Sequence, residues 1–168
     1  MFNVGEKIVY GNSGVFVVGD LTGSPVDKND TRLFYVLRPM YGPEGNIICT
    51  PVDNDKVSMR QLISKEEAER LIERIPEIDL LTVVNEKQRR DVYKVSLANS
   101  GLDDYISIIK TVYNRRTESV KNKKRISETD AEYEKRAKFC LYSELSTVLG
   151  MAFEDVDCVV IDRIKEAI

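Results

Sequence analysis

The chain has 168 residues, of which 42% are hydrophobic and 32% charged, with no histidine, no tryptophan and a net charge of −3. This length suits one medium domain or two small ones, and the hydrophobic fraction is sufficient for a buried core. The lack of histidine excludes serine–histidine and cysteine–histidine catalysis and removes the commonest general base.

No apolar run approaches the ~20 residues of a membrane span, and the N-terminus lacks a basic start followed by an apolar stretch. We therefore expect a cytoplasmic protein that does not contact a membrane. Three cysteines, Cys49, Cys140 and Cys158, are far apart and odd in number. This pattern predicts free thiols rather than a disulfide framework or a zinc site, and we expect no metal or cofactor.

Short β-type segments separated by turn residues fill the first sixty residues. The predicted strands lie at residues 4–10, 15–21, 33–37 and 46–50, with a fifth extended piece near 57–60. Short strands at regular spacing with turn signals between them predict a five-stranded SH3-like or Tudor-like barrel. The glycines at 11 and 14 are turn residues and not a phosphate loop, since no GK[ST] follows them.

Helical patterns begin near residue 64. Five helices are predicted: one from Ser64 to Pro76, one over 86–98, one from near Leu102, one from Ser127 to Gly150, and a last one whose apolar face is Val156, Val159, Val160 and Ile164. Capping residues, proline and glycine mark most of these ends. We therefore predict an α+β chain, strands first, with a Tudor-like barrel domain over 1–62 and a compact five-helix domain over 63–168.

Charge is distributed unevenly along the predicted helices. Residues 85–125 carry 11 basic and 5 acidic side chains, whereas residues 126–168 carry 5 basic and 10 acidic ones. Lysine and arginine contacts to phosphates provide sequence-independent affinity for nucleic acid. The candidate DNA-binding residues are Lys87, Arg89, Arg90, Lys94, Lys110, Arg115, Arg116, Lys121, Lys123, Lys124 and Arg125. The alternative is a solvated helix face in salt bridges with acidic neighbours, which the last helices could supply.

The barrel offers a second candidate site, because small barrels expose strand edges that can accept a strand from a partner. The alternative is a barrel that merely packs on the helices. Neighbouring acids occur at Asp53 and Asp55 and at Asp103 and Asp104, but the second pair suits the first turn of a helix. We predict that the protein is not an enzyme.

A family resemblance runs through these elements. The segments Phe2-Asn-Val-Gly-Glu-Lys-Ile-Val-Tyr10, Gly14-Val15 and Tyr35-Val-Leu37 resemble the opening of the CarD/CdnL family, and Ile48-Cys-Thr-Pro-Val52 resembles a family strand that ends in a proline–valine step. Arg60, Arg89-Arg90 and Ser100-Gly101 extend the resemblance over nearly the whole chain. The N-terminal pattern is shared with the polymerase-contacting domain of the transcription-repair coupling factor.

The resemblance implies a bacterial transcription regulator without a small-molecule substrate. Its Tudor-like domain would dock on the RNA polymerase β subunit through an exposed strand edge, at Ile47, Ile48, Cys49, Thr50 and Pro51. Its helical domain would contact promoter DNA at the upstream edge of the bubble, weakly and largely without sequence preference, and stabilise the open complex. Arg89, Arg90 and Lys94 would face the DNA backbone.

One position departs from the family pattern. Known members insert a tryptophan into the minor groove as a wedge, and an ungapped alignment puts Lys87 at that position. Lysine cannot wedge as an indole does, but it can contact a phosphate. The competing hypothesis is a protein–protein adaptor whose barrel binds a partner's strand and whose helical domain does not bind DNA. A salt-dependent affinity for forked DNA separates the two.

Overall fold

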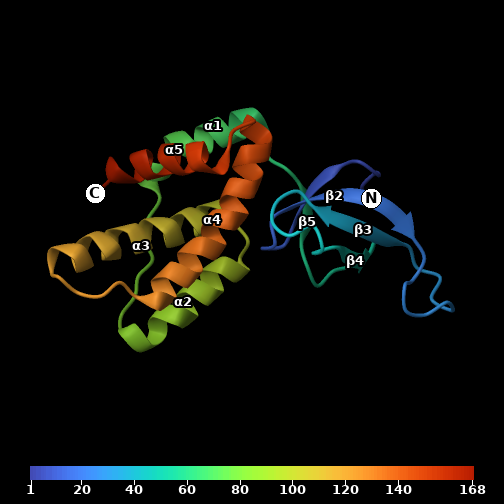
Figure 1. Cartoon of the computed structure of the whole chain (residues 1–168), viewed down its shortest axis with the longest axis horizontal. Coiled ribbons are helices and arrows are strands. Elements are labelled where there is room, and N and C mark those ends of the chain that lie inside the picture. The colour runs from blue at the N-terminus through green and yellow to red at the C-terminus, as the bar shows by residue number, and fades with distance from the viewer. The chain divides into compact units, whose positions relative to one another are not determined.

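A computed structural model describes all residues, 1–168, which divide into two compact units, Met1–Leu62 and Ile63–Ile168 (Figure 1). The first unit contains five β-strands, and the second contains five α-helices and one 3-10 helix. The predicted α+β class, with strands first and helices after them, is confirmed.

The first unit is an antiparallel sheet with the strand order β4-β3-β2-β1-β5. Its strands are β1 (Lys7–Tyr10), β2 (Val15–Thr22), β3 (Phe34–Pro39), β4 (Ile48–Pro51) and β5 (Met59–Gln61). Strands β4 and β5 are the two edges and do not pair with each other, so the predicted five-stranded unit is an open sheet and not a closed barrel. Closure needs two staggered edges that pair along their length, and these edge strands have only four and three residues.

Strand β2 carries a bulge where its pairing with β3 shifts between Val18 and Asp20. Gly19 lies at this shift, and a Cβ atom there would sit 3.0 Å from Nε of Arg38. A bulge bends a strand and increases its twist. One face of the twisted sheet forms the core of the unit, with the buried side chains Ile8, Phe16, Val18, Tyr35 and Leu37.

The helical unit follows the predicted capping signals closely. Its elements are α1 (Lys65–Glu73), the 3-10 helix η1 (Ile75–Glu77), α2 (Glu86–Ala98), α3 (Leu102–Lys121), α4 (Glu128–Leu149) and α5 (Phe153–Lys165). Ser64 and Glu67 form the predicted capping box at α1, and the Asn85 side chain accepts the backbone N–H of Gln88 at α2. None of the helices combines the length and the apolar character that a membrane span requires.

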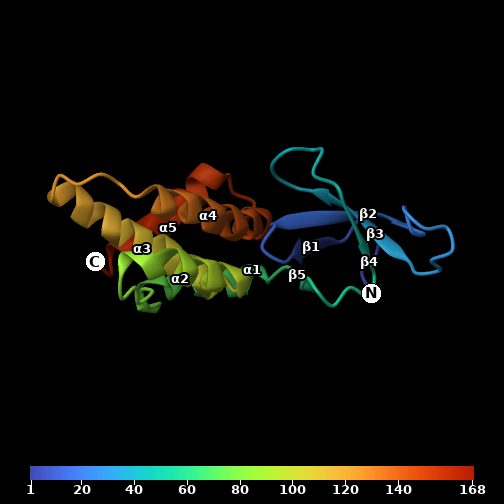
Figure 2. The ribbon, with the colours of Figure 1, turned by 90° about the horizontal axis from the view of Figure 1, so that it is seen from below.

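Helix α4 is the centre of the helical unit and contacts each of the other four helices (Figures 1 and 2). Buried residues therefore occur on several of its sides, among them Ala137, Leu141 and Leu145. Helix α1 lies beside α5, and α2 lies against α3 and α4. The last turns of α3 project past the neighbouring helices, and the connection to α4 runs back from there (Figure 2).

Candidate functional site

Strand β4 exposes one backbone edge of the sheet. It pairs only with β3, in the register Tyr35↔Thr50 and Val36↔Cys49. The amide of Val52 donates to the carbonyl of Leu33 at 2.9 Å. Because backbone groups alternate along a strand, Thr50 faces β3 and the N–H and C=O of Cys49 face outward. This outward edge has no strand partner in the unit.

The five residues predicted for polymerase docking lie in or next to this edge, although not all are accessible. Ile47 and Cys49 have exposed side chains, and Ile48 and Pro51 are half-buried. Thr50 is buried, with 2% of its surface exposed, and its hydroxyl accepts a hydrogen bond from Asn54 at 2.9 Å. The edge therefore offers main-chain groups flanked by two exposed side chains.

In the helical unit, Arg89 does not face solvent. Only 8% of its surface is exposed, and its guanidinium donates to Oδ1 of Asp130 at 3.1 Å and pairs with Glu86. Arg115 donates from Nε to Oδ2 of the same Asp130 at 3.1 Å and also pairs with Glu86. These contacts join α2, α3 and the start of α4 and leave Arg89 unavailable to DNA.

Tyr93 completes this buried cluster by donating its hydroxyl to Oδ1 of Asp130 at 2.8 Å. Burial, followed by the hydrogen bond to the Asp130 carboxylate, raises the pKa of Tyr93 well above its ordinary value. Tyr93 therefore remains a neutral donor throughout the physiological range. The buried charges of Arg89 and Asp130 oppose each other, as buried charges require, while the partly exposed Arg115 and the exposed Glu86 extend the cluster to two cations and two anions.

Arg116 belongs to a second ionic network. It pairs with Glu134 of α4, and this hydrogen-bonded contact raises the pKa of the guanidinium. Glu134 also forms an ion pair with Lys138 at 3.3 Å, and Lys138 pairs with Asp157 of α5 at 2.9 Å. The alternative interpretation of the basic stretch, salt bridges with acids of the last helices, therefore describes Arg89, Arg115 and Arg116.

Lys110 belongs to neither of these two ionic networks. Its ammonium group is buried and donates to the backbone carbonyls of Ile75, Pro76 and Ile78 at 3.1, 2.8 and 2.6 Å. Burial lowers the pKa of Lys110. This side chain satisfies the carbonyls at the end of η1 and is not part of a basic surface.

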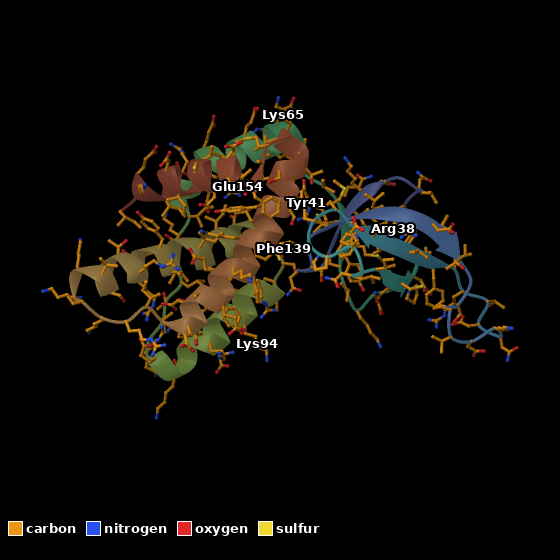
Figure 3. All side chains as sticks on the ribbon, in the orientation of Figure 1. Arg38, Tyr41, Lys65, Lys94, Phe139 and Glu154 are labelled. Carbon is orange, nitrogen blue, oxygen red and sulfur yellow. The ribbon has the colours of Figure 1, made fainter.

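Seven of the eleven predicted DNA-binding residues remain exposed, in two groups. Lys87, Arg90 and Lys94 lie on one face of α2, since residues three and four apart are neighbours on a helix surface. Figure 3 labels Lys94 on this helix. The second group follows the end of α3 and consists of Lys121, Lys123, Lys124 and Arg125. The structure separates these two groups from the other four basic residues, which are buried or half-buried in internal contacts.

The acids that hold the internal arginines were not among the predicted site residues. Asp130 and Glu134 are buried on α4, with 4% and 6% of their surfaces exposed. Their spacing of four residues puts them on one side of the helix, opposite consecutive arginines of α3. An acid pair at this spacing in a helix with apolar neighbours is the one signal in the sequence that pointed to them.

The geometry defines a protein with an open sheet edge in one unit and exposed basic groups in the other. The family model of the CarD-like/TRCF RID domain matches residues 2–63. The first unit is therefore similar to the CarD-like/TRCF RID domain, and the family of that domain is non-catalytic and interacts with RNA polymerase. This match ends where the helical unit begins, and no curated protein matches the chain.

Proposed function

We propose that this protein is a non-enzymatic bacterial transcription regulator that docks on the β subunit of RNA polymerase and contacts promoter DNA near the upstream edge of the bubble. The observation that carries the proposal is the RID-family match of the first unit, because this family interacts with polymerase. The docking site and the DNA contact lie on different parts of the chain.

The docking site in this proposal is the outward edge of β4. An exposed edge can accept a strand from a partner, with main-chain hydrogen bonds supplying affinity. Cys49 would provide the outward N–H and C=O, and Ile47, 46% exposed, would provide apolar contact beside them. Thr50 and Ile48 would act indirectly, by holding β4 on the sheet.

The DNA surface in this proposal consists of exposed basic residues only. Lys87 and Lys94 of α2 make no ion pair within the chain, so their charges are available to phosphates. The internal network at Asp130 fixes the helix that carries them. The proposed set is Lys87, Arg90, Lys94, Lys121, Lys123, Lys124 and Arg125, without the four basic residues that are buried or half-buried.

The mechanism requires no chemical step. A protein that binds the melted promoter better than the closed one shifts the equilibrium toward the open complex by its differential affinity. With Lys87 at the position of the family's wedge tryptophan, the contact would rest on phosphates. The expected affinity is therefore modest, strongly salt-dependent and nearly independent of sequence.

The test is the binding of forked DNA by the full chain at several salt concentrations. We expect the logarithm of the affinity to fall linearly with the logarithm of the salt concentration, and the slope to become shallower by about one for each phosphate contact removed at Lys87, Arg90 or Lys94. Absence of any salt-dependent binding would contradict the DNA part of the proposal.

The second candidate is a protein–protein adaptor that docks on polymerase and does not bind DNA. The observation that favours it is the internal pairing of Arg89, Arg115 and Arg116, which removes much of the basic excess from the surface. The same DNA titration distinguishes the two functions, since an adaptor would still bind polymerase while showing no affinity for forked DNA.

A further inference from the structure

Tyr133 of α4 holds two guanidinium groups at the surface beside the basic face of α2. The guanidinium carbon of Arg90 lies 5.9 Å from the centre of the Tyr133 ring, and that of Arg136 lies 5.3 Å from it. Both distances are within the range of a cation–π interaction. The two guanidinium carbons are therefore within about 11 Å of each other.

The tyrosine is well placed to orient these groups. Its ring is buried, with 3% of the residue exposed, and packs against the Tyr93 ring at a centroid distance of 5.6 Å. The hydroxyl of Tyr93 in turn donates a hydrogen bond to Asp130. A ring fixed in this way restricts the guanidinium groups above it, which reduces the entropy they lose when they bind a ligand.

Both arginines are accessible to solvent, but only Arg90 has an acidic partner within the chain. Arg90 contacts Glu132 at 3.3 Å, and the two side chains are 57% and 46% exposed. An ion pair with this exposure is weak and can be displaced. Arg136 is exposed and makes no ion pair within the chain.

We propose that Arg136 and Arg90, held on Tyr133, form a two-guanidinium site for phosphates of the DNA backbone. Arg136 lies outside the basic stretch and belongs to an acidic segment, so charge counting does not point to it. Planar guanidinium groups bind phosphate oxygens with paired hydrogen bonds. Duplex DNA carries one charge per about 1.7 Å of its axis, so both groups can reach a phosphate. The inference rests on the proposed function and adds α4 to its DNA surface.

The experiment compares Arg136→Gln with Lys135→Gln in the full chain, by titration of forked DNA at several salt concentrations. The two substitutions remove the same charge from adjacent exposed positions of α4, but only Arg136 lies over the ring. We expect Arg136→Gln and Arg90→Gln each to weaken binding and make the salt slope shallower by about one, while Lys135→Gln leaves the slope unchanged.

Two further variants test the roles of Tyr133 and Glu132. Tyr133→Phe keeps the ring and is expected to bind as the wild type does, whereas Tyr133→Leu should weaken binding if it folds. Glu132→Gln should strengthen binding, because it removes the competing anion beside Arg90.

Equal effects of Arg136→Gln and Lys135→Gln, with a normal loss for Arg90→Gln, would overturn this site and leave the proposed function intact. Absence of salt-dependent DNA binding by the wild type would overturn both. The comparison at Arg136 and Lys135 decides the matter even if Tyr133→Leu fails to fold.

Discussion

Lys110 and Lys94 are alike in the sequence and opposite in the structure. Both belong to predicted helices in the basic stretch, and both were predicted to bind DNA. Lys94 is exposed on α2, whereas Lys110 is 4% exposed and donates to three carbonyls around η1. The sequence could not separate them, because the carbonyls that Lys110 binds lie more than thirty residues away along the chain.

These two lysines should therefore give opposite results when replaced by methionine. Lys110→Met removes the ammonium donor from these carbonyls, of which only that of Ile75 also accepts a backbone N–H, from Ile78. It should lower the free energy of unfolding by about 2 kcal/mol. Lys94→Met should change it by less than about 0.5 kcal/mol but should weaken DNA binding. Urea denaturation and DNA titration of both variants check this, and a stability loss at Lys94 would contradict the structure.

The three cysteines also differ at the residue scale. Burial raises the pKa of the Cys140 thiol to about 11, whereas Cys49 and Cys158 are exposed. At pH 8 about one Cys140 thiol in a thousand is a thiolate, the reactive form.

We expect a thiol reagent to modify two cysteines quickly and the third only slowly or on unfolding. Mass spectrometry of peptides from partially modified protein would identify the slow one. Equal modification rates for all three cysteines would show that Cys140 is not buried as it is in the structure.

At the scale of elements, local signals predicted most of the fold. Asn85, Ser127 and Gly150 mark helix ends in the sequence and lie at helix ends in the structure. The five strands were predicted, but whether their sheet closes was not, because closure depends on pairing between two edges, which no local pattern encodes. Whether the basic residues of α2 and α3 bind DNA or pair with acids was likewise left open by the sequence. The acids that pair with them lie on another helix, α4, and no local pattern shows which helices pack together.

Strand β4 is the element on which the docking proposal depends, because its outward edge would accept the partner's strand. Proline at position 49 removes an outward N–H while leaving the hydrogen bonds of Thr50 to β3 possible. We expect Cys49→Pro to lose binding to polymerase, and Cys49→Thr, which keeps the N–H and suits a strand, to retain it. Pull-down with purified polymerase measures this, with circular dichroism as the folding control. Full binding by Cys49→Pro would exclude strand addition at β4.

The ends of α3 and α4 give a pair of stability predictions with opposite signs. Lys123 has a φ of 54° and Gly150 a φ of 65°, a left-handed conformation that costs a residue with a Cβ about 1 kcal/mol. Lys123→Gly should therefore raise the melting temperature and Gly150→Ala should lower it. The space around Gly150 is open, so its loss would come from backbone conformation alone. A rise for Gly150→Ala would refute this explanation.

At the scale of the whole molecule, the charge pattern has a structural part and a part that we propose binds DNA. Arg89, Arg115 and Arg116 are paired with acids inside the helical unit, and other basic residues remain on its surface. Charge counting along the chain could find the basic stretch but could not divide it between these two roles. The division matters because only the exposed part can provide the salt-dependent affinity that a DNA-binding regulator requires.

The most direct test of the central claim is the lifetime of open complexes formed by bacterial RNA polymerase on a promoter, after challenge with a competitor. The wild-type protein should lengthen this lifetime. The combined variant Lys87→Gln, Arg90→Gln and Lys94→Gln should still bind polymerase but leave the lifetime close to that of polymerase alone. An equal extension by this variant, or none by the wild type, would contradict the account.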